Sequence, residues 1–145
     1  MTKPISHIGW DLWRASDAWK ARFVREMVAA GHAWFGEARA ALLGHLDRAG
    51  SRQSDLVGRM GTSKQAVQQL IDELVATGIL ERTPDPDDRR AKWVGLTPAG
   101  LAAIRDSDRV KQQLDAEYRR TLGPKRFAAL KAALATLAQA ERGDL

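Results

Sequence analysis

Residues 79–96 contain two short stretches of strand-forming residues on either side of a turn-rich, charged segment. The stretches cover 79–83 and 92–96, and the segment 84–90 between them has two prolines, three aspartates and two arginines. Prolines and aspartates at this density favour a turn and interrupt regular structure. The pattern therefore predicts a β-hairpin with a projecting, charged loop.

The residues before this hairpin predict two short helices joined by a tight turn. Ser51 is a candidate N-cap for a helix that runs to Met60, and Gly61 supplies the turn. Residues 62–74 predict the second helix, since their apolar residues recur at helical spacing: Val67, Leu70, Ile71 and Leu74. Helix, tight turn, helix and hairpin in this order is the winged helix-turn-helix arrangement.

Longer helices are predicted on both sides of this lobe. Apolar periodicity predicts helices over 8–30 and 36–49. Thr97-Pro98 is a strong helix start and predicts a helix that runs to about Leu122. A last helix is predicted after Gly123-Pro124. We thus expect a mainly α fold with a small β-hairpin wing. It would comprise an N-terminal dimerisation helix (1–35), a winged helix-turn-helix DNA-binding lobe (36–98) and C-terminal dimerisation helices (99–145), in one compact chain. The apolar faces of the outer helices exceed what so small a lobe can cover, and a second copy of the chain is the simplest partner.

Composition excludes several classes of protein. The chain has no cysteine, which excludes disulfides, thiolate metal sites and thiol redox chemistry. No apolar run reaches the ~20 residues of a membrane span, and the N-terminus does not resemble a signal peptide, so we expect a cytoplasmic protein without membrane contact.

Histidines lack metal-ligand spacing and no catalytic motif is present, so we expect no enzyme, no metal and no cofactor. The net charge of +5 permits a nucleic-acid partner, although residues 51–92 carry seven basic and seven acidic side chains.

The segment from Ser51 to Gly100 resembles the MarR family of winged-helix transcriptional regulators. The resemblance rests on residues 53–56, 61–67, 70–74, 78–82 and 96–100, and above all on the run from Asp85 to Lys92. It implies a homodimer whose lobes straddle a pseudo-palindromic DNA site and whose binding is commonly relieved by a small ligand. Two features depart from the family pattern. The chain has no cysteine, which excludes the peroxide sensing by a cysteine found in some relatives. Late in the recognition helix, Gln69 and Glu73 replace the usual basic residues.

Candidate base-reading and phosphate-contacting residues lie at the start of the second motif helix. They are Ser63, Lys64, Gln65, Gln68 and Gln69. Glutamine can pair with adenine through two hydrogen bonds, and lysine can contact guanine or a phosphate. The alternative is a solvated helix face on which Gln65 closes a capping box onto Thr62.

Further DNA contacts are predicted in the wing and at the start of the first motif helix. Arg89 and Arg90 lie near the wing tip, where one arginine can enter a minor groove while the other braces the loop. The family pattern pairs Asp88 with Arg90 as a wing-bracing contact, and the alternative is a solvated charge run. Backbone N–H groups of Ser51, Arg52 and Gln53 could bind a phosphate if these residues begin a helix.

A ligand pocket is a further hypothesis. Tryptophans off the apolar stripe could line a cleft for a flat aromatic acid, with a cation holding its carboxylate. The candidates are Trp10, Trp13, Arg14, His32 and Trp34. The alternative is that the tryptophans belong to a dimer core.

The function we expect is a sequence-specific transcriptional regulator, a ligand-responsive repressor that binds double-stranded DNA as a homodimer. The alternative is a winged-helix protein–protein interaction module that has lost DNA binding, which the neutral charge of residues 51–92 would favour.

Overall fold

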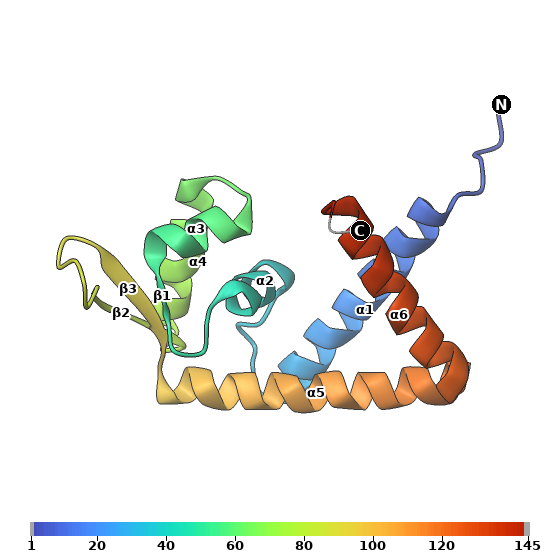
Figure 1. Ribbon diagram of the computed structural model, residues 1–145. Helices are drawn as coiled ribbons and strands as arrows, with labels where there is room; N and C mark the ends of the chain where they lie inside the picture. The colour runs from blue at the N-terminus through green and yellow to red at the C-terminus, as the bar shows by residue number, and fades with distance from the viewer. Residues whose placement is uncertain (1, 144–145) are drawn as a thin grey trace. The chain divides into compact units, whose positions relative to one another are not determined.

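The computed structural model describes residues 2–143, which fall into two compact units divided between Ser107 and Asp108. The helices and strands of these residues follow the predicted order, with one additional short strand (Figure 1). They are α1 (Ile8–Ala29), α2 (Glu37–His45), β1 (Ser51–Arg52), α3 (Gln53–Met60), α4 (Lys64–Ala76), β2 (Leu80–Pro84), β3 (Lys92–Leu96), α5 (Pro98–Leu122) and α6 (Pro124–Glu141). The mainly α fold with a small β wing is thus confirmed.

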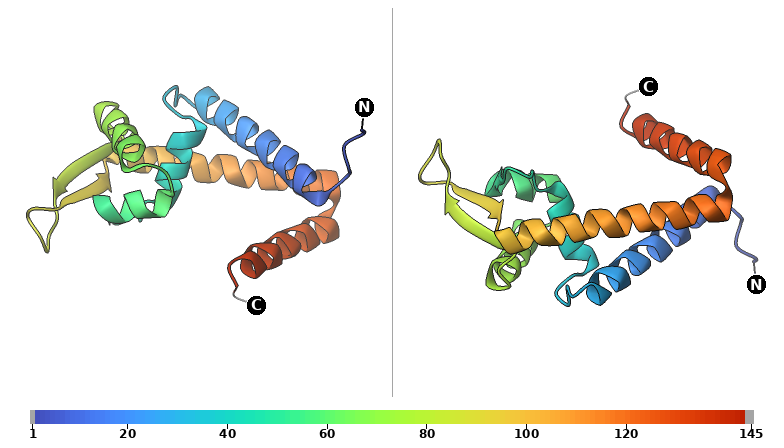
Figure 2. Two further views of the ribbon diagram at one scale, coloured as in Figure 1. Left: turned by 90° about the horizontal axis from the view of Figure 1, so that it is seen from above. Right: turned by 90° about the horizontal axis from the view of Figure 1, so that it is seen from below.

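The core of the winged lobe lies between α2, α3, α4 and the sheet. Its fully buried side chains come from each of these elements: Leu42, Leu56, Val67, Ile71, Leu74, Leu80 and Val94. The apolar stripe predicted for α4 therefore faces the core. In Figure 2 the β2–β3 hairpin extends away from α3 and α4, and its loop is not covered by these helices.

The sheet has three antiparallel strands in the order β1-β3-β2. The hairpin pairs Leu80 with Leu96 and Pro84 with Lys92, within one residue of the predicted strands. Strand β1 was not predicted: Ser51 pairs with Val94, and Arg52 pairs with Trp93. This strand fixes the start of α3 against the base of the wing.

Ser51 is not the N-cap of α3, so that prediction is wrong. Its side chain is buried, and its Oγ accepts a hydrogen bond from the backbone N–H of Asp47 at 3.1 Å. The helix starts two residues later, at Gln53, with Arg52 as an N-cap that makes no side-chain capping bond. Ser51 and Arg52 thus lie in β1, and of the three residues predicted to begin the helix only Gln53 is helical, so a phosphate contact by these residues stays a prediction.

Gly50 explains why a strand forms here. Its φ of +97° lies in the left-handed region, and a Cβ at this position would lie 2.3 Å from Nε1 of Trp93. Only glycine lets the chain turn this close to the indole ring before it pairs with β3. Helix α2, which precedes this turn, ends at His45, four residues before the predicted end at 49.

The apolar stripe of α1 is buried over only part of its length. Phe23 and Met27 are buried, and the Trp19 ring stacks on Phe23. In contrast, Ile8 and Leu12 in the first half of the helix are exposed. Exposed leucines also follow one another along α6: Leu130, Leu134 and Leu137.

The predicted division of the chain into 1–35, 36–98 and 99–145 differs from the two units of the structure. Helix α1 belongs to the same unit as the winged lobe, and the unit boundary lies within α5. Residues 1 and 144–145 of the predicted ranges lie outside the described residues. The dimerisation roles of the outer helices remain predictions. Among residues 2–143, no helix has the length and apolar character to cross a bilayer.

Candidate nucleic-acid interface

The N-terminal end of α4 presents a polar face of three glutamines and one lysine. Lys64, Gln65 and Gln69 are exposed, and Gln68 is half-buried. The N-cap is Ser63, whose Oγ accepts a hydrogen bond from the N–H of Ala66 at 3.1 Å. The alternative of a capping box from Thr62 to Gln65 is therefore wrong, and the Gln65 side chain is not used for capping.

A groove of about 280 Å³ runs between this face, the start of α3 and the start of β3 beside the wing loop. Three of the side chains that line it are cationic: Arg52, Lys64 and Lys92. Gln53 and Gln68 also line it. The structure thus brings together residues predicted from separate segments of the sequence.

Arg82 connects the start of α3 to the middle of α4. Its Nε donates to Oε1 of Gln53 at 2.9 Å, and its Nη2 lies 2.6 Å from Oδ1 of Asp72. Because arginine only donates, the Gln53 carbonyl must face Arg82, and the Gln53 amide N–H₂ remains available as a donor. This role of Arg82 has no signal in the sequence, since its partners lie 29 and 10 residues away.

Glu73 anchors α4 to the rest of the lobe. Arg39 of α2 donates through Nη2 to the Glu73 carboxylate at 2.8 Å and through Nη1 to the carbonyl oxygen of Trp34 at 2.8 Å. The other carboxylate oxygen lies 3.5 Å from Nε2 of Gln69. The acidic residue at this family-atypical position therefore has a structural partner on α2.

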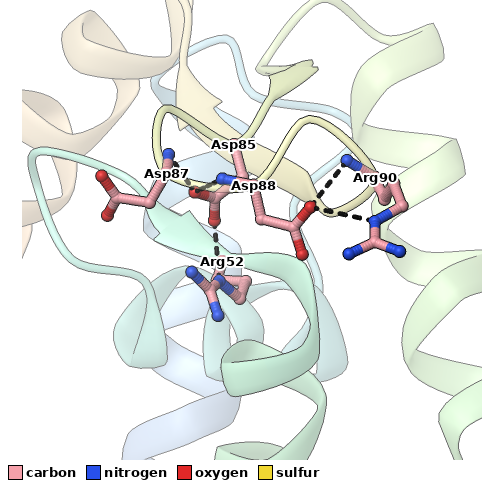
Figure 3. A network of polar contacts seen from close by, with 5 residues as sticks. All are labelled: Arg52, Asp85, Asp87, Asp88 and Arg90. Carbon is pink, nitrogen blue, oxygen red and sulfur yellow. Dashed lines mark hydrogen bonds and ion pairs between the residues drawn. The ribbon is translucent and has the colours of Figure 1, made fainter.

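The wing loop is organised around one buried carboxylate, that of Asp85 (Figure 3). Its Oδ2 accepts from Nε of Arg52 at 2.7 Å, and its Oδ1 accepts from the N–H groups of Asp87 at 2.8 Å and Asp88 at 3.3 Å. The Arg52 hydrogen bond, followed by that of the Asp87 N–H, holds the pKa of Asp85 below its usual range. The hydrogen bond to Asp85 in turn raises the pKa of Arg52. Neither residue is predicted in this role from the sequence.

Asp88 and Arg90 interact as the family pattern implies. Oδ1 of Asp88 accepts from the backbone N–H of Arg90 at 3.0 Å and lies 3.6 Å from Arg90 Nε (Figure 3). The Arg90 side chain is 95% exposed, so its Nη atoms face solvent. Arg89 is also exposed, and within residues 2–143 no ion pair of its side chain is found. Arg90 is thus the wing arginine whose position is set by the loop.

The five residues predicted to line a ligand pocket do not meet in one chain. Trp10, Trp13 and Arg14 are exposed in the first half of α1, while His32 and Trp34 follow its end. At a rise of 1.5 Å per residue, Arg14 and the end of the helix are separated by roughly 20 Å. The pocket as predicted is therefore not formed within a single chain.

His32 also has a partner that the sequence did not reveal. Its Nε2 lies 2.7 Å from Oδ2 of Asp106 on α5, and the Trp34 ring meets it edge to face. Trp34 packs against the lobe core. Nε2 of the His32 imidazole is therefore already bound to Asp106 and is not available to a ligand carboxylate.

The tight turn between α3 and α4, the exposed start of α4 and the braced hairpin together define a winged helix-turn-helix protein. Residues 37–91 match a sequence model described as the MarR family. This match covers less than half of the chain, and over it the chain is similar to the MarR family.

Solved structures of MarR and of another transcriptional regulator share the fold over nearly the whole chain. Wild-type apo MarR from E. coli is 25% identical, with 92% of this chain and 98% of that chain covered and a TM-score of 0.71. The transcriptional repressor CouR, bound to a 23-mer DNA duplex, is 24% identical over 94% and 99% of the two chains, with a TM-score of 0.75. A mutant of E. coli MarR, complexed with operator DNA, is 22% identical over 90% and 92%, with a TM-score of 0.73. A comparison with curated protein sequences gave no significant match.

Proposed function

We propose that the chain is a sequence-specific DNA-binding repressor that occupies a pseudo-palindromic operator. The observation that carries this proposal is the exposed glutamine face of α4 beside a wing whose loop presents Arg90 to solvent. Glutamines suit direct reading of base edges in the major groove, and a wing arginine suits the minor groove. Two solved structures of this fold are bound to DNA, which supports DNA as the partner of this chain.

The working form is a homodimer. Apolar side chains in the first half of α1 and along α6 are exposed: Ile8, Trp10, Leu12, Trp13, Leu130, Leu134 and Leu137. Exposed apolar faces of this extent mark interaction sites in soluble proteins. Two copies related by a two-fold axis would place two recognition helices on one duplex.

The repressor responds to a small ligand, for which a planar aromatic acid remains our candidate class. Such a ligand relieves repression only if it binds the DNA-free arrangement more tightly than the DNA-bound one. Its site is not built from the five residues named above within one chain, because α1 separates them. A panel of benzoic and phenolic acids, scored by operator affinity, tests this part.

The second candidate function is a protein–protein module that keeps the fold without binding DNA. The balanced charge of residues 51–92 favours it. Against it, three cations line the groove between α3, α4 and the wing, so positive charge of this segment is gathered where DNA would lie.

A salt titration of binding to random duplex DNA separates the two candidates. A DNA-binding lobe loses affinity with a log–log slope of about −0.9 for each phosphate that it neutralises. We expect a slope of several units for this chain. Binding that is absent, or independent of salt, would favour the protein–protein module.

A further inference from the structure

Arg52 faces the DNA-binding groove, yet its Nε is engaged with the wing. It is one of two residues of β1, and its backbone pairs with that of Trp93 on β3. Its position is therefore fixed by the sheet, at the end of the hairpin next to the loop. An arginine on such a groove would ordinarily be assigned to a DNA phosphate.

Asp85, the partner of Arg52, controls the shape of the whole loop. Its side chain is 1% exposed, and both of its oxygens are used. Oδ1 closes the turn at Asp87 and Asp88, and the backbone N–H of Asp85 donates to the carbonyl oxygen of Ala91 across the loop. Asp88 in turn holds Arg90. A continuous series of contacts thus leads from Arg52 to Arg90 (Figure 3).

A buried carboxylate needs a charged or hydrogen-bonded partner to remain ionised. Arg52 is the cationic partner of Asp85 within residues 2–143, and its hydrogen bond is the largest cause of the low pKa of that carboxyl. Without Arg52, Oδ2 of Asp85 would be left buried and unpaired. The loop would then have to open to hydrate it.

We propose that Arg52 is a positioning residue for the wing: through Asp85 it sets the loop that carries Arg90, and it contributes to DNA binding by this route rather than by contacting a phosphate. The inference rests on the proposed DNA-binding function. Its test therefore includes a measurement on the free protein, which does not depend on DNA.

Two substitutions of Arg52 separate the routes. The ε atom of a glutamine lies as many bonds from the backbone as Nε of arginine, so Arg52→Gln keeps a donor to Asp85 but removes the charge. Arg52→Met has a similar length and keeps neither. If Arg52 contacts a phosphate, both substitutions should lower the affinity for DNA, since both remove the cation. If Arg52 positions the wing, mainly Arg52→Met should lower that affinity.

The matched control is Arg59→Met on α3. Arg59 donates to the carbonyl oxygen of His45 and lies 3.2 Å from both a carboxylate oxygen of Asp47 and Oγ of Ser51, so it braces the lobe next to β1 through contacts that do not include the wing loop. Thermal unfolding of each variant reports the general loss of stability, and the control shows what such a loss alone does to DNA affinity.

The experiment measures amide hydrogen exchange of Asp87 and Ala91 in the free protein, and affinity for duplex DNA at several salt concentrations. We expect Arg52→Met to accelerate exchange of these two amides and to lower affinity by about tenfold or more, the scale of removing a charge-assisted hydrogen bond. Arg52→Gln should stay within about threefold of the parent, with an unchanged salt slope. Arg59→Met should leave the exchange of both amides unchanged.

A second pair of variants keeps the test decisive if Arg52→Met folds poorly. Asp85→Asn retains an oxygen for the turn but sets an amide N–H₂ against Arg52, so it should lose affinity. Adding Arg52→Gln offers that amide an acceptor and should restore affinity in part.

Several outcomes would overturn the proposal. Equal losses of affinity in Arg52→Gln and Arg52→Met, with a salt slope shallower by about one unit, would assign Arg52 to a phosphate. Unchanged exchange of Asp87 and Ala91 in Arg52→Met would show that Arg52 does not order the loop. If the parent binds no duplex, the proposed function fails, while the exchange data still decide whether Arg52 sets the loop.

Discussion

Asp85 illustrates how one side chain can organise a functional loop. Its carboxylate is buried, accepts three hydrogen bonds and has a pKa below its usual range because of Arg52 and the Asp87 N–H. A carboxyl whose pKa is depressed by folding stabilises the folded state above its unfolded pKa. This contribution is lost as the pH falls through the lower, folded-state pKa.

The sign of this linkage gives a pH prediction. At neutral pH, Asp85→Asn should unfold at a lower urea concentration than the parent. The difference should shrink as the pH falls below the reference pKa of 3.8, because the parent carboxyl is then progressively protonated. Urea midpoints of both proteins between about pH 7 and pH 3 measure it. A difference that grows on acidification would contradict the assigned role of the carboxylate.

Individual residues were the least predictable part of the site. The Asp88–Arg90 contact lies within the family pattern, two residues apart, and the structure contains it. The Arg52–Asp85 pair spans 33 residues and depends on β1, a strand of two residues with no periodicity to detect. Ser51 has the residue type of an N-cap, but the turn at Gly50 carries it into the sheet instead.

At the scale of elements, we propose different roles in DNA binding for the second motif helix and the wing. The start of α4 exposes mainly glutamine side chains beside Lys64, which suits base reading. The wing exposes Arg89 and Arg90, which suits the minor groove, whose width and negative potential vary with sequence and are sensed without base-specific hydrogen bonds. The division follows from the side chains that each element exposes.

Matched substitutions test this division. Gln65→Ala or Gln68→Ala should change base preference, by roughly 1–3 kcal/mol for each bidentate base pairing that is removed. Arg89→Ala combined with Arg90→Ala should weaken binding to all sequences and make the salt slope shallower. Affinities for a set of single-base operator variants distinguish these patterns. A double wing variant that binds as tightly as the parent would show that the wing does not contact DNA.

Elements with strong local signals were predicted well. Helix α4 and both hairpin strands lie within two residues of their predicted bounds, because apolar spacing, a terminal glycine and a turn-rich loop all point to the same structure. Helix α2 was predicted four residues too long, since its last turn and the loop after it have similar composition. The contacts that orient α4, from Arg39 and Arg82, required knowledge of the tertiary fold.

At the scale of the whole molecule, the exposed apolar side chains of α1 and α6 indicate where a second copy of the chain would bind. Each compact unit has its own buried residues, yet exposed apolar side chains occur in both, on α1 and on α6. The sequence predicted that these helices carry more apolar surface than one lobe can cover, and their exposure agrees with that prediction. The proposal that a second copy covers them explains why a lobe with one recognition helix would read a symmetric site.

Selection of bound sequences from a random DNA pool tests dimeric DNA recognition most directly. If two copies present two recognition helices to one duplex, the selected sites should form a pseudo-palindrome. Its half-sites should be separated by about one helical turn, roughly 10 bp centre to centre. Enrichment of a single, asymmetric half-site would contradict the dimeric arrangement, and failure to enrich any sequence would contradict DNA recognition itself.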